Sequence, residues 1–298
     1  MSRRILYLLN PVSGTRQKSP LIQQIASYTT KKKIPFEILP TNAEGDYIAV
    51  RKKILAEKIT DVVVCGGDGS VNQAVYPLAD TGVQFGIVPL GSGNGLALAA
   101  KIPRSTAKAL DVIFAGKSSL VDGFMVNDRF ACMLCGLGFD AAIAHEFAGY
   151  GSRGFTAYAK LTAKKFFSAR PYKFSVKVSG REFNTEAFFI SVANSNQFGN
   201  HFTIAPAASL SDGLLDVVIV KKTFKPVLLW NVLQQVLAGK IKKVEQSLDE
   251  PVIYFQTKTL SITNGARAPM HIDGEPKNSE KEIRIKVLPK FFNLIQPS

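Results

Sequence analysis

The sequence is poor in cysteine and histidine, with three of each among 298 residues. The cysteines, Cys65, Cys132 and Cys135, are odd in number, and we predict no export signal, so a disulfide framework is not expected. Cys132 and Cys135 lie in the apolar segment FACMLCGLGF, and no second cysteine pair is available to complete a zinc site. This setting favours simple burial over a metal or redox role.

Long apolar runs are also missing. The two longest stretches without Asp, Glu, Lys or Arg, residues 81–100 and 187–211, are rich in Gly, Asn, Ser or Pro, so neither is typical of a membrane-spanning helix. Near the N-terminus, Asn10 and Pro11 interrupt an apolar run before it reaches the length of a signal-peptide core. We therefore expect a cytoplasmic protein.

Acidic residues are in short supply. Asp and Glu number 23 against 37 Lys and Arg, which gives a formal net charge of +14. Such an excess favours a polyanionic partner, which could be nucleic acid, an anionic membrane surface or a phosphorylated substrate. Residues 150–181 contain basic and aromatic residues but no acidic one. We predict a helix at residues 154–167, whose lysines either are ordinary surface residues or face anionic lipid headgroups.

Two domains are expected from the pattern of apolar residues. Residues 1–121 alternate short apolar runs with helical stretches, which predicts a Rossmann-like α/β domain with a mostly parallel sheet. Residues 122–298 consist mainly of alternating, β-branched and aromatic segments, which predict an antiparallel β-sandwich with a further helix at residues 226–237. The last residues could return to the N-terminal domain.

Three loops rich in Gly, Asn and Ser follow predicted parallel strands: NPVSG at residues 10–14, GGDGS at 66–70 and GSGNG at 91–95. Ligands of open α/β sheets bind at the carboxyl ends of the strands, where backbone N–H groups and a helix N-terminus can hold phosphate. We expect a helix to begin near Ser70, with this residue as its cap. One such loop is often only a turn, but three in corresponding positions favour a nucleotide site. None matches the P-loop or the GxGxxG pattern.

The order NPVSG, GGDGS, PLGSGNGLA, SDGLLDVVIV and HIDGE resembles the diacylglycerol kinase catalytic family, which includes soluble bacterial lipid kinases and sphingosine kinases. The resemblance extends over nearly the whole chain, whereas GGDG alone is shared with NAD kinases and phosphofructokinases. It implies a phosphofructokinase- and NAD kinase-like parallel sheet followed by a lipid-binding sandwich. The third loop is closer to the sphingosine kinase form than to the Gly-Thr-x-Asn-Asp of many bacterial diacylglycerol kinases, so the acceptor lipid stays open.

The resemblance also implies ATP and Mg²⁺ as cofactors. Asp68 stands among glycines where it would repel bare phosphates, but a carboxylate suits Mg²⁺ because hard cations take oxygen ligands. We therefore expect Asp68 to hold the metal directly or through water. The residues expected to bind the nucleotide are Asn10, Thr41, Gly66, Gly67, Asp68, Gly69, Ser70, Gly91, Ser92, Gly93 and Asn94.

The motif HIDGE carries the expected general base. By resemblance, Asp273 accepts the proton of the lipid hydroxyl, Glu275 supports it, and Asp68 completes the catalytic set. Asp-Gly is also a favoured pair for a hairpin turn, and both interpretations can hold. Asp212 is a candidate ligand of a structural divalent ion, and Asp122 could join the water network around magnesium. For both residues a plain Asp-Gly turn is the alternative.

The favoured hypothesis is an ATP- and Mg²⁺-dependent lipid kinase of lipid metabolism, with its active site in a cleft between the two domains. Its acceptor would be diacylglycerol, a sphingoid base or a related lipid at the anionic inner membrane surface, where the protein would be peripheral. The alternatives are a kinase of the NAD kinase type and a non-catalytic lipid-binding protein. No nucleic-acid partner is expected, because no RNA- or DNA-binding motif occurs. The oligomeric state, including a homodimer, stays open.

Overall fold

The computed structural model describes residues 3–13, 18–42, 44–149, 155–166, 168–199, 202–203, 205–223 and 250–297. The helix predicted at residues 226–237 lies outside them. The chain divides into two compact units. The first comprises Met1–Val121 together with Lys290–Ser298, and the second comprises Asp122–Pro289.

The first unit is built on a parallel sheet with the strand order β4-β3-β1-β2. Its strands are β1 (Ile5–Leu9), β2 (Phe36–Pro40), β3 (Asp61–Gly66) and β4 (Gln84–Pro89). Strands β1 and β3 are buried along their whole length, as expected for a parallel sheet with both faces covered. The end of β17 (Glu282–Ile295) extends this sheet, because Asn293 and Leu294 pair in parallel with β4.

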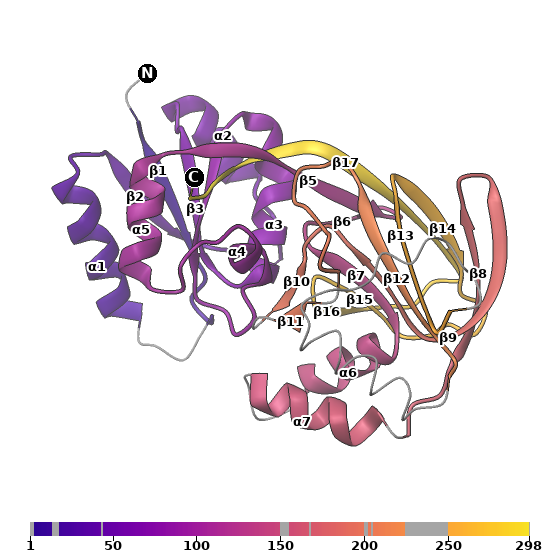
Figure 1. Ribbon diagram of the computed structural model, residues 1–298. Coiled ribbons are helices and arrows are strands. Elements are labelled where there is room, and N and C mark those ends of the chain that lie inside the picture. The colour runs from indigo at the N-terminus through magenta and orange to yellow at the C-terminus, as the bar shows by residue number, and fades with distance from the viewer. Residues whose placement is uncertain are drawn as a thin grey trace. The chain divides into compact units, whose positions relative to one another are not determined.

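Helices cover both faces of this sheet (Figure 1). They are α1 (Lys18–Lys31), α2 (Ile48–Glu57), α3 (Asp68–Leu78), α4 (Gly95–Ala99) and α5 (Thr106–Ala115), with a 3-10 turn at Ala79–Thr81. Leu21 and Ile25 of α1 and Leu110 of α5 pack in one cluster with Tyr7 and Val63 of the strands. The α/β prediction is confirmed. Helix α5 was not predicted from the sequence.

The second unit is mainly antiparallel. Its strands are the last part of β5 (Ser118–Val126), then β6 (Arg129–Ala131), β7 (Leu134–Gly138), β8 (Tyr172–Val178), β9 (Arg181–Ala193), β10 (Gln197–Gly199), β11 (Phe202–Thr203), β12 (Leu215–Lys221), β13 (Val252–Thr257), β14 (Thr259–Thr263), β15 (Met270–Ile272), β16 (Glu275–Lys277) and the first part of β17. The main order is β16-β15-β7-β9-β8-β14-β17, and β12 pairs with both β9 and β13. Alternate residues of these strands form one apolar core, which confirms the predicted β-sandwich class.

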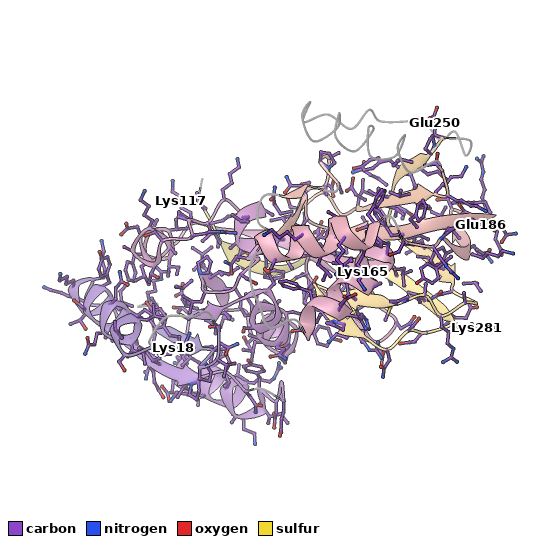
Figure 2. The ribbon with its side chains drawn as sticks, turned by 90° about the horizontal axis from the view of Figure 1, so that it is seen from below. Lys18, Lys117, Lys165, Glu186, Glu250 and Lys281 are labelled. Carbon is purple, nitrogen blue, oxygen red and sulfur yellow. The ribbon has the colours of Figure 1, made fainter. Side chains whose placement is uncertain are left out.

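Two helices of the second unit, α6 (Phe139–Ala148) and α7 (Phe155–Phe166), lie side by side (Figure 1). The rings of Phe139 and Phe166 meet edge to face at 6.0 Å, and Lys165 forms an ion pair with Glu146 at 2.9 Å (Figure 2). Helix α7 confirms the helix expected at residues 154–167. Across the described ranges, no helix has both the length and the apolar character needed to cross a membrane.

Candidate functional site

The three glycine-rich loops of the first unit begin at one edge of its sheet. Adjacent strands β4, β3 and β1 end in register, with Pro89 opposite Gly66 and Cys65 opposite Leu9. Beyond the strands, the N–H of Asn10 donates to the Cys65 carbonyl at 3.0 Å. The N–H of Thr41 donates to the Leu9 carbonyl at 3.0 Å, so Thr41 follows β2 at the same edge.

Asp68 links the second loop to the third. It is the first residue of α3, where a carboxylate interacts favourably with the positive end of the helix. Its Oδ2 accepts the N–H of Gly95 at 3.0 Å, and its Oδ1 accepts the N–H of Leu96 at 3.2 Å. The expected magnesium ligand therefore also caps the first turn of α4.

Asn10 links the first loop to the second. Its Nδ2 donates to Ser70 Oγ at 2.7 Å, while its Oδ1 accepts the N–H of Val12 at 2.9 Å. The expectation that Ser70 caps its helix is wrong, because α3 begins at Asp68 and Gly67 occupies the N-cap position. The buried Ser70 hydroxyl instead accepts the bond from Asn10.

The third loop is closed by its own asparagine. Asn94 is 4% exposed and has a φ of +52°, and its side chain both accepts the N–H of Gly91 at 2.9 Å and donates to the Gly91 carbonyl at 2.6 Å. A Cβ atom on Gly91 would lie 2.6 Å from the Cα atom of Gly67. The two loops touch backbone to backbone, which requires glycine at position 91 and leaves little room for a side chain at position 67.

The remaining expected nucleotide residues surround these contacts. A Cβ atom on Gly66 would lie 2.6 Å from Ser70 Oγ, so this position also needs glycine. Ser92 is exposed, Gly69 is partly buried, and the Gly93 carbonyl accepts a bond from Arg104 at 3.2 Å. The first unit thus presents backbone N–H groups and the N-termini of α3 and α4 at one sheet edge, an arrangement suited to phosphate.

Lys18 is a basic residue of the first loop region that the sequence did not single out. It begins α1, and its Nζ donates to the carbonyl of Ser13 in the NPVSG segment (Figure 2). Partial burial lowers the pKa of the Lys18 amino group from its ordinary value. A positive charge at the N-terminus of a helix interacts unfavourably with the helix dipole. The position of Lys18 was therefore the signal in the sequence that this residue could serve the loop before the helix.

In the second unit, Asp273 and Gly274 form the two-residue turn between β15 and β16. Their φ angles are +50° and +81°, the combination required by a type I′ hairpin turn. The predicted Asp-Gly turn is therefore present, and it places Asp273 at the tip and Glu275 at the first position of β16.

The Asp273 carboxylate is 6% exposed and accepts four hydrogen bonds. Oδ1 receives the N–H groups of Met133 and Leu134, both at 2.9 Å, and Oδ2 receives the N–H of Cys132 at 2.9 Å and its thiol at 3.3 Å. A carboxylate has about four acceptor positions, so these bonds hold it firmly in one orientation. Three of the donors are backbone groups, which leave no signal in the sequence.

The cysteine segment is buried, as predicted, but it does more than fill space. All three cysteines lie within the described residues and are buried thiols. Burial raises the pKa of the Cys135 thiol, and the nearby carboxylates of Asp140 and Asp273 add to this shift. Cys132 contributes two of the donors to Asp273.

Glu275 is far more accessible than Asp273. Its side chain is 45% exposed, and its Oε2 forms an ion pair with Lys277 at 3.0 Å along the same strand. The hairpin thus carries one carboxylate locked by the backbone and one that reaches solvent.

Asp122 and Asp212 meet at another turn of the second unit. Asp122 is fully buried and its Oδ2 accepts the N–H of Gly213 at 2.7 Å. Asp212 is exposed and its Oδ1 accepts the N–H of Leu214 at 3.0 Å, as the turn interpretation predicts. In the part of the chain that the structure describes, no group of three or more His, Cys, Asp or Glu side chains could hold a metal ion.

Asp216 is a buried carboxylate that the sequence did not flag. It lies on β12 with no exposed surface, and it accepts bonds from Tyr254 and from Gln256, the latter at 3.3 Å. Burial raises the pKa of Tyr254, and the bond to Asp216 raises it further. The signal in the sequence for a buried carboxylate was an acidic residue within the apolar run LLDVVIV.

The protein combines an α/β unit that carries three linked glycine-rich loops with an antiparallel unit that carries the Asp273–Glu275 hairpin. Both units match known protein families. Residues 4–126 match the family described as "Diacylglycerol kinase catalytic domain", and residues 134–296 match the one described as "YegS C-terminal NAD kinase beta sandwich-like domain". The chain belongs to the diacylglycerol kinase family of lipid kinases.

Individual relatives agree with this assignment. A "Probable lipid kinase YegS-like" protein from Pectobacterium atrosepticum is 30% identical over 85% of this chain and 83% of its own length. A "Diacylglycerol kinase" from Bacillus subtilis is 26% identical over 91% of this chain and 89% of its own. A crystal structure titled as a diacylglycerol kinase from Bacillus anthracis has the same fold, with a TM-score of 0.75 at 19% identity over 99% of this chain and 97% of that one.

Proposed function

We propose that the protein is an ATP- and Mg²⁺-dependent kinase that transfers the γ-phosphate of ATP to a lipid hydroxyl. The observation that carries this proposal is the linkage of three glycine-rich loops through Asp68 and Asn10 at one edge of the parallel sheet. In a lipid kinase family, such an edge is the expected place for the phosphates of the nucleotide.

Asp68 fits a magnesium ion. Mg²⁺ usually keeps several waters and needs only one or two protein carboxylates beside the phosphates, so a single aspartate among backbone N–H groups is a suitable set. When bound, the ion would supply neutralisation of charge on the phosphates. Asp122 and Asp212 are proposed as further metal-associated residues, and their shared turn supports a local structural role.

The hairpin supports a division of labour in which Glu275 takes the proton of the lipid hydroxyl and Asp273 holds the turn. We expected Asp273 to be the base with Glu275 in support. The four bonds on the Asp273 carboxylate leave it poorly placed to accept a further proton, whereas Glu275 is accessible. A general base must come within hydrogen-bond reach of the proton that it removes.

The proposed acceptor lies at an anionic membrane surface, which the protein would contact peripherally from the cytoplasm. The net charge of +14 supports this, and so does α7, whose Lys160 and Lys164 are exposed while Leu161 is buried. Each basic residue near such a surface contributes on the order of 1 kcal/mol.

A panel of acceptors tests the proposal. Labelled ATP and Mg²⁺ are supplied with diacylglycerol, a sphingoid base or phosphatidylglycerol in detergent micelles, and NAD is offered in parallel. We expect label in at least one lipid and none in NAD. Label in NAD alone would overturn the lipid kinase assignment in favour of the NAD kinase type, and label in no acceptor would favour a binding protein.

A further inference from the structure

A buried histidine and a buried aspartate lie beneath the hairpin of the second unit. His271 of β15 has no exposed surface, and its Nε2 lies 3.4 Å from Oδ2 of Asp140, whose side chain is 9% exposed. Asp140 belongs to the first turn of α6, where its Oδ1 accepts the N–H of Ala141 at 2.8 Å. One carboxylate therefore accepts an N–H of the first helical turn with one oxygen and faces His271 with the other.

The other ring nitrogen of His271 contacts the turn itself. The N–H of Gly274 donates to His271 Nδ1 at 3.3 Å. A nitrogen that accepts a hydrogen bond carries no proton, so in the neutral ring the proton sits on Nε2, facing the Asp140 carboxylate. Asp140, His271 and Gly274 thus form a series of polar contacts, in which the carboxylate faces the ring at 3.4 Å and the ring accepts a hydrogen bond from the turn between Asp273 and Glu275.

The backbone of β7 makes room for this pair. Gly136 lies directly opposite His271 in the β15–β7 pairing. A Cβ atom on Gly136 would collide with both Asp140 Oδ2 and His271 Nε2. Helix α6 holds β15 at a second point, because His145 Nε2 donates to the Met270 carbonyl at 2.8 Å.

Stability alone does not account for a polar pair at this place. Burying charged or polar groups carries a desolvation penalty, and well-packed apolar side chains of similar volume are often at least as stable. A pair of apolar side chains, however, makes no directional contact and could not fix the orientation of the turn amide. The hydrogen bond from the Gly274 N–H to His271 Nδ1, backed by the contact of the His271 ring with the Asp140 carboxylate, fixes the orientation of the turn amide, and Glu275 is the next residue.

We infer that Asp140 and His271 are positioning residues for phosphoryl transfer. They hold the amide of Gly274 and so set the direction in which Glu275 presents its carboxylate to the lipid hydroxyl. This role rests on the proposed kinase function. Neither residue is proposed to contact the substrate. Substitutions of either should lower turnover and leave the glycine-rich loops of the first unit unchanged.

Three substitutions test the Asp140–His271 contact and the hydrogen bond from Gly274 to His271 separately. Asp140→Asn places an amide donor against the Nε2–H donor, which breaks the pair at little cost in volume. His271→Gln keeps a nitrogen near Asp140 but removes the acceptor for Gly274. His271→Asn keeps the acceptor for Gly274, because its carboxamide oxygen takes the place of Nδ1, but the shorter side chain loses the contact with Asp140.

Turnover and hydrogen exchange are the two readouts. We expect kcat to fall on the order of 10- to 100-fold in Asp140→Asn and His271→Gln, with the KM for ATP unchanged, as is typical when a supporting group is lost. His271→Asn keeps the acceptor for Gly274 but loses the contact with Asp140, so its kcat should fall to the level of Asp140→Asn. Amide exchange within residues 270–277 should become faster in Asp140→Asn and His271→Gln, without change at residues 66–70.

Ile219→Val serves as the control for lost stability, because Ile219 is fully buried on β12 and the change removes one methyl group from the core. If this control, matched in thermal unfolding, lost as much kcat as Asp140→Asn, the positioning role would be overturned. Wild-type kcat in His271→Gln or in Asp140→Asn would overturn it while leaving the kinase proposal intact. Failure of the wild-type protein to phosphorylate any lipid would overturn the kinase proposal, and this role with it.

Discussion

Asp68 accepts the backbone N–H of Gly95 at 3.0 Å and so joins two loops that lie 27 positions apart in the chain. The same carboxylate is the expected magnesium ligand. Any substitution at this position should therefore change both the chemistry of the proposed nucleotide site and the shape of the loop beside it.

Asp68→Ala should weaken ATP binding more in the presence of Mg²⁺ than in its absence. It should also lower the free energy of unfolding on the order of 1–3 kcal/mol, because the N–H groups of Gly95 and Leu96 lose their acceptor. Calorimetric ATP titrations with and without Mg²⁺, together with denaturant unfolding, measure the two effects. Wild-type binding under both conditions would make Asp68 a purely structural residue.

Gly91→Ala should damage nucleotide binding although it replaces no side chain of the site. Its Cβ atom would lie 2.6 Å from the Cα atom of Gly67 and 2.9 Å from Asn94 Oδ1, so the second and third loops must move apart. Gly265→Ala is the matched control, because nothing lies within 4 Å of the added atom. ATP titration of both variants decides the matter, and equal affinities would show that the close approach is not needed for binding.

Glu275→Gln and Asp273→Asn should fail in different ways. Glu275→Gln keeps the shape of the hairpin, so we expect kcat to fall by about 10² or more with unchanged ATP affinity and thermal stability. Asp273→Asn replaces one acceptor oxygen by a donor that faces backbone N–H groups, so it should lower thermal stability as well as kcat. A loss of kcat in Asp273→Asn alone, with normal turnover in Glu275→Gln, would restore Asp273 as the base.

Tyr7 should make the first unit sensitive to alkaline pH. Its hydroxyl bonds to Thr29 Oγ1 at 2.8 Å inside the core, and burial raises the pKa of Tyr7 from 10.0 to about 12. The folded protein keeps the phenolic proton where the unfolded chain loses it, so this contribution to stability is complete below pH 10 and disappears as pH rises to 12. The loss is about 3 kcal/mol.

Denaturant unfolding of wild type and Tyr7→Phe across this pH range measures that contribution. We expect the difference in unfolding free energy between the two proteins to shrink above pH 10. A constant difference up to pH 12 would contradict the raised pKa.

Removal of exposed lysines from α7 should weaken membrane contact. We expect Lys160→Gln with Lys164→Gln to reduce binding to vesicles that contain anionic lipid, and to reduce phosphorylation of an acceptor in a bilayer more than of a short-chain, water-soluble one. Lys52→Gln with Lys108→Gln makes the same charge change at exposed positions of α2 and α5. Vesicle sedimentation at rising salt compares the pairs, and equal effects would mean that net charge alone matters.

The sequence predicted those features that arise from local pattern. The buried runs of β1 and β3 and the glycine-rich loops indicated a parallel sheet, and the Asp273–Gly274 pair indicated a hairpin turn, because side-chain period and turn chemistry are encoded within a few neighbouring residues. Helix α5 was missed although Ser105 precedes it and Gly116 follows it in the left-handed conformation, and these are ordinary signals of helix ends.

The contacts that define the site could not be predicted in the same way. The donors to Asp273 are mostly backbone N–H groups of residues 132–134, and every residue type except proline carries one. His271 and Asp140 are 131 positions apart, and only the pairing of β15 with β7 brings them together. The proposed exchange of roles between Asp273 and Glu275 rests on this burial, which a motif of five letters does not contain.

The pairing of β17 with β4 affects how the first unit can fold during synthesis of the protein. Asn293 and Leu294 pair with β4, and the ring of Phe292 packs against Phe85 at 5.8 Å inside the first unit. During translation, residues 1–121 therefore emerge from the ribosome long before their sheet can be completed. The first unit must wait, with this edge of β4 unpaired, until the whole second unit has been synthesised, and a fragment that stops at residue 121 would keep that open edge permanently.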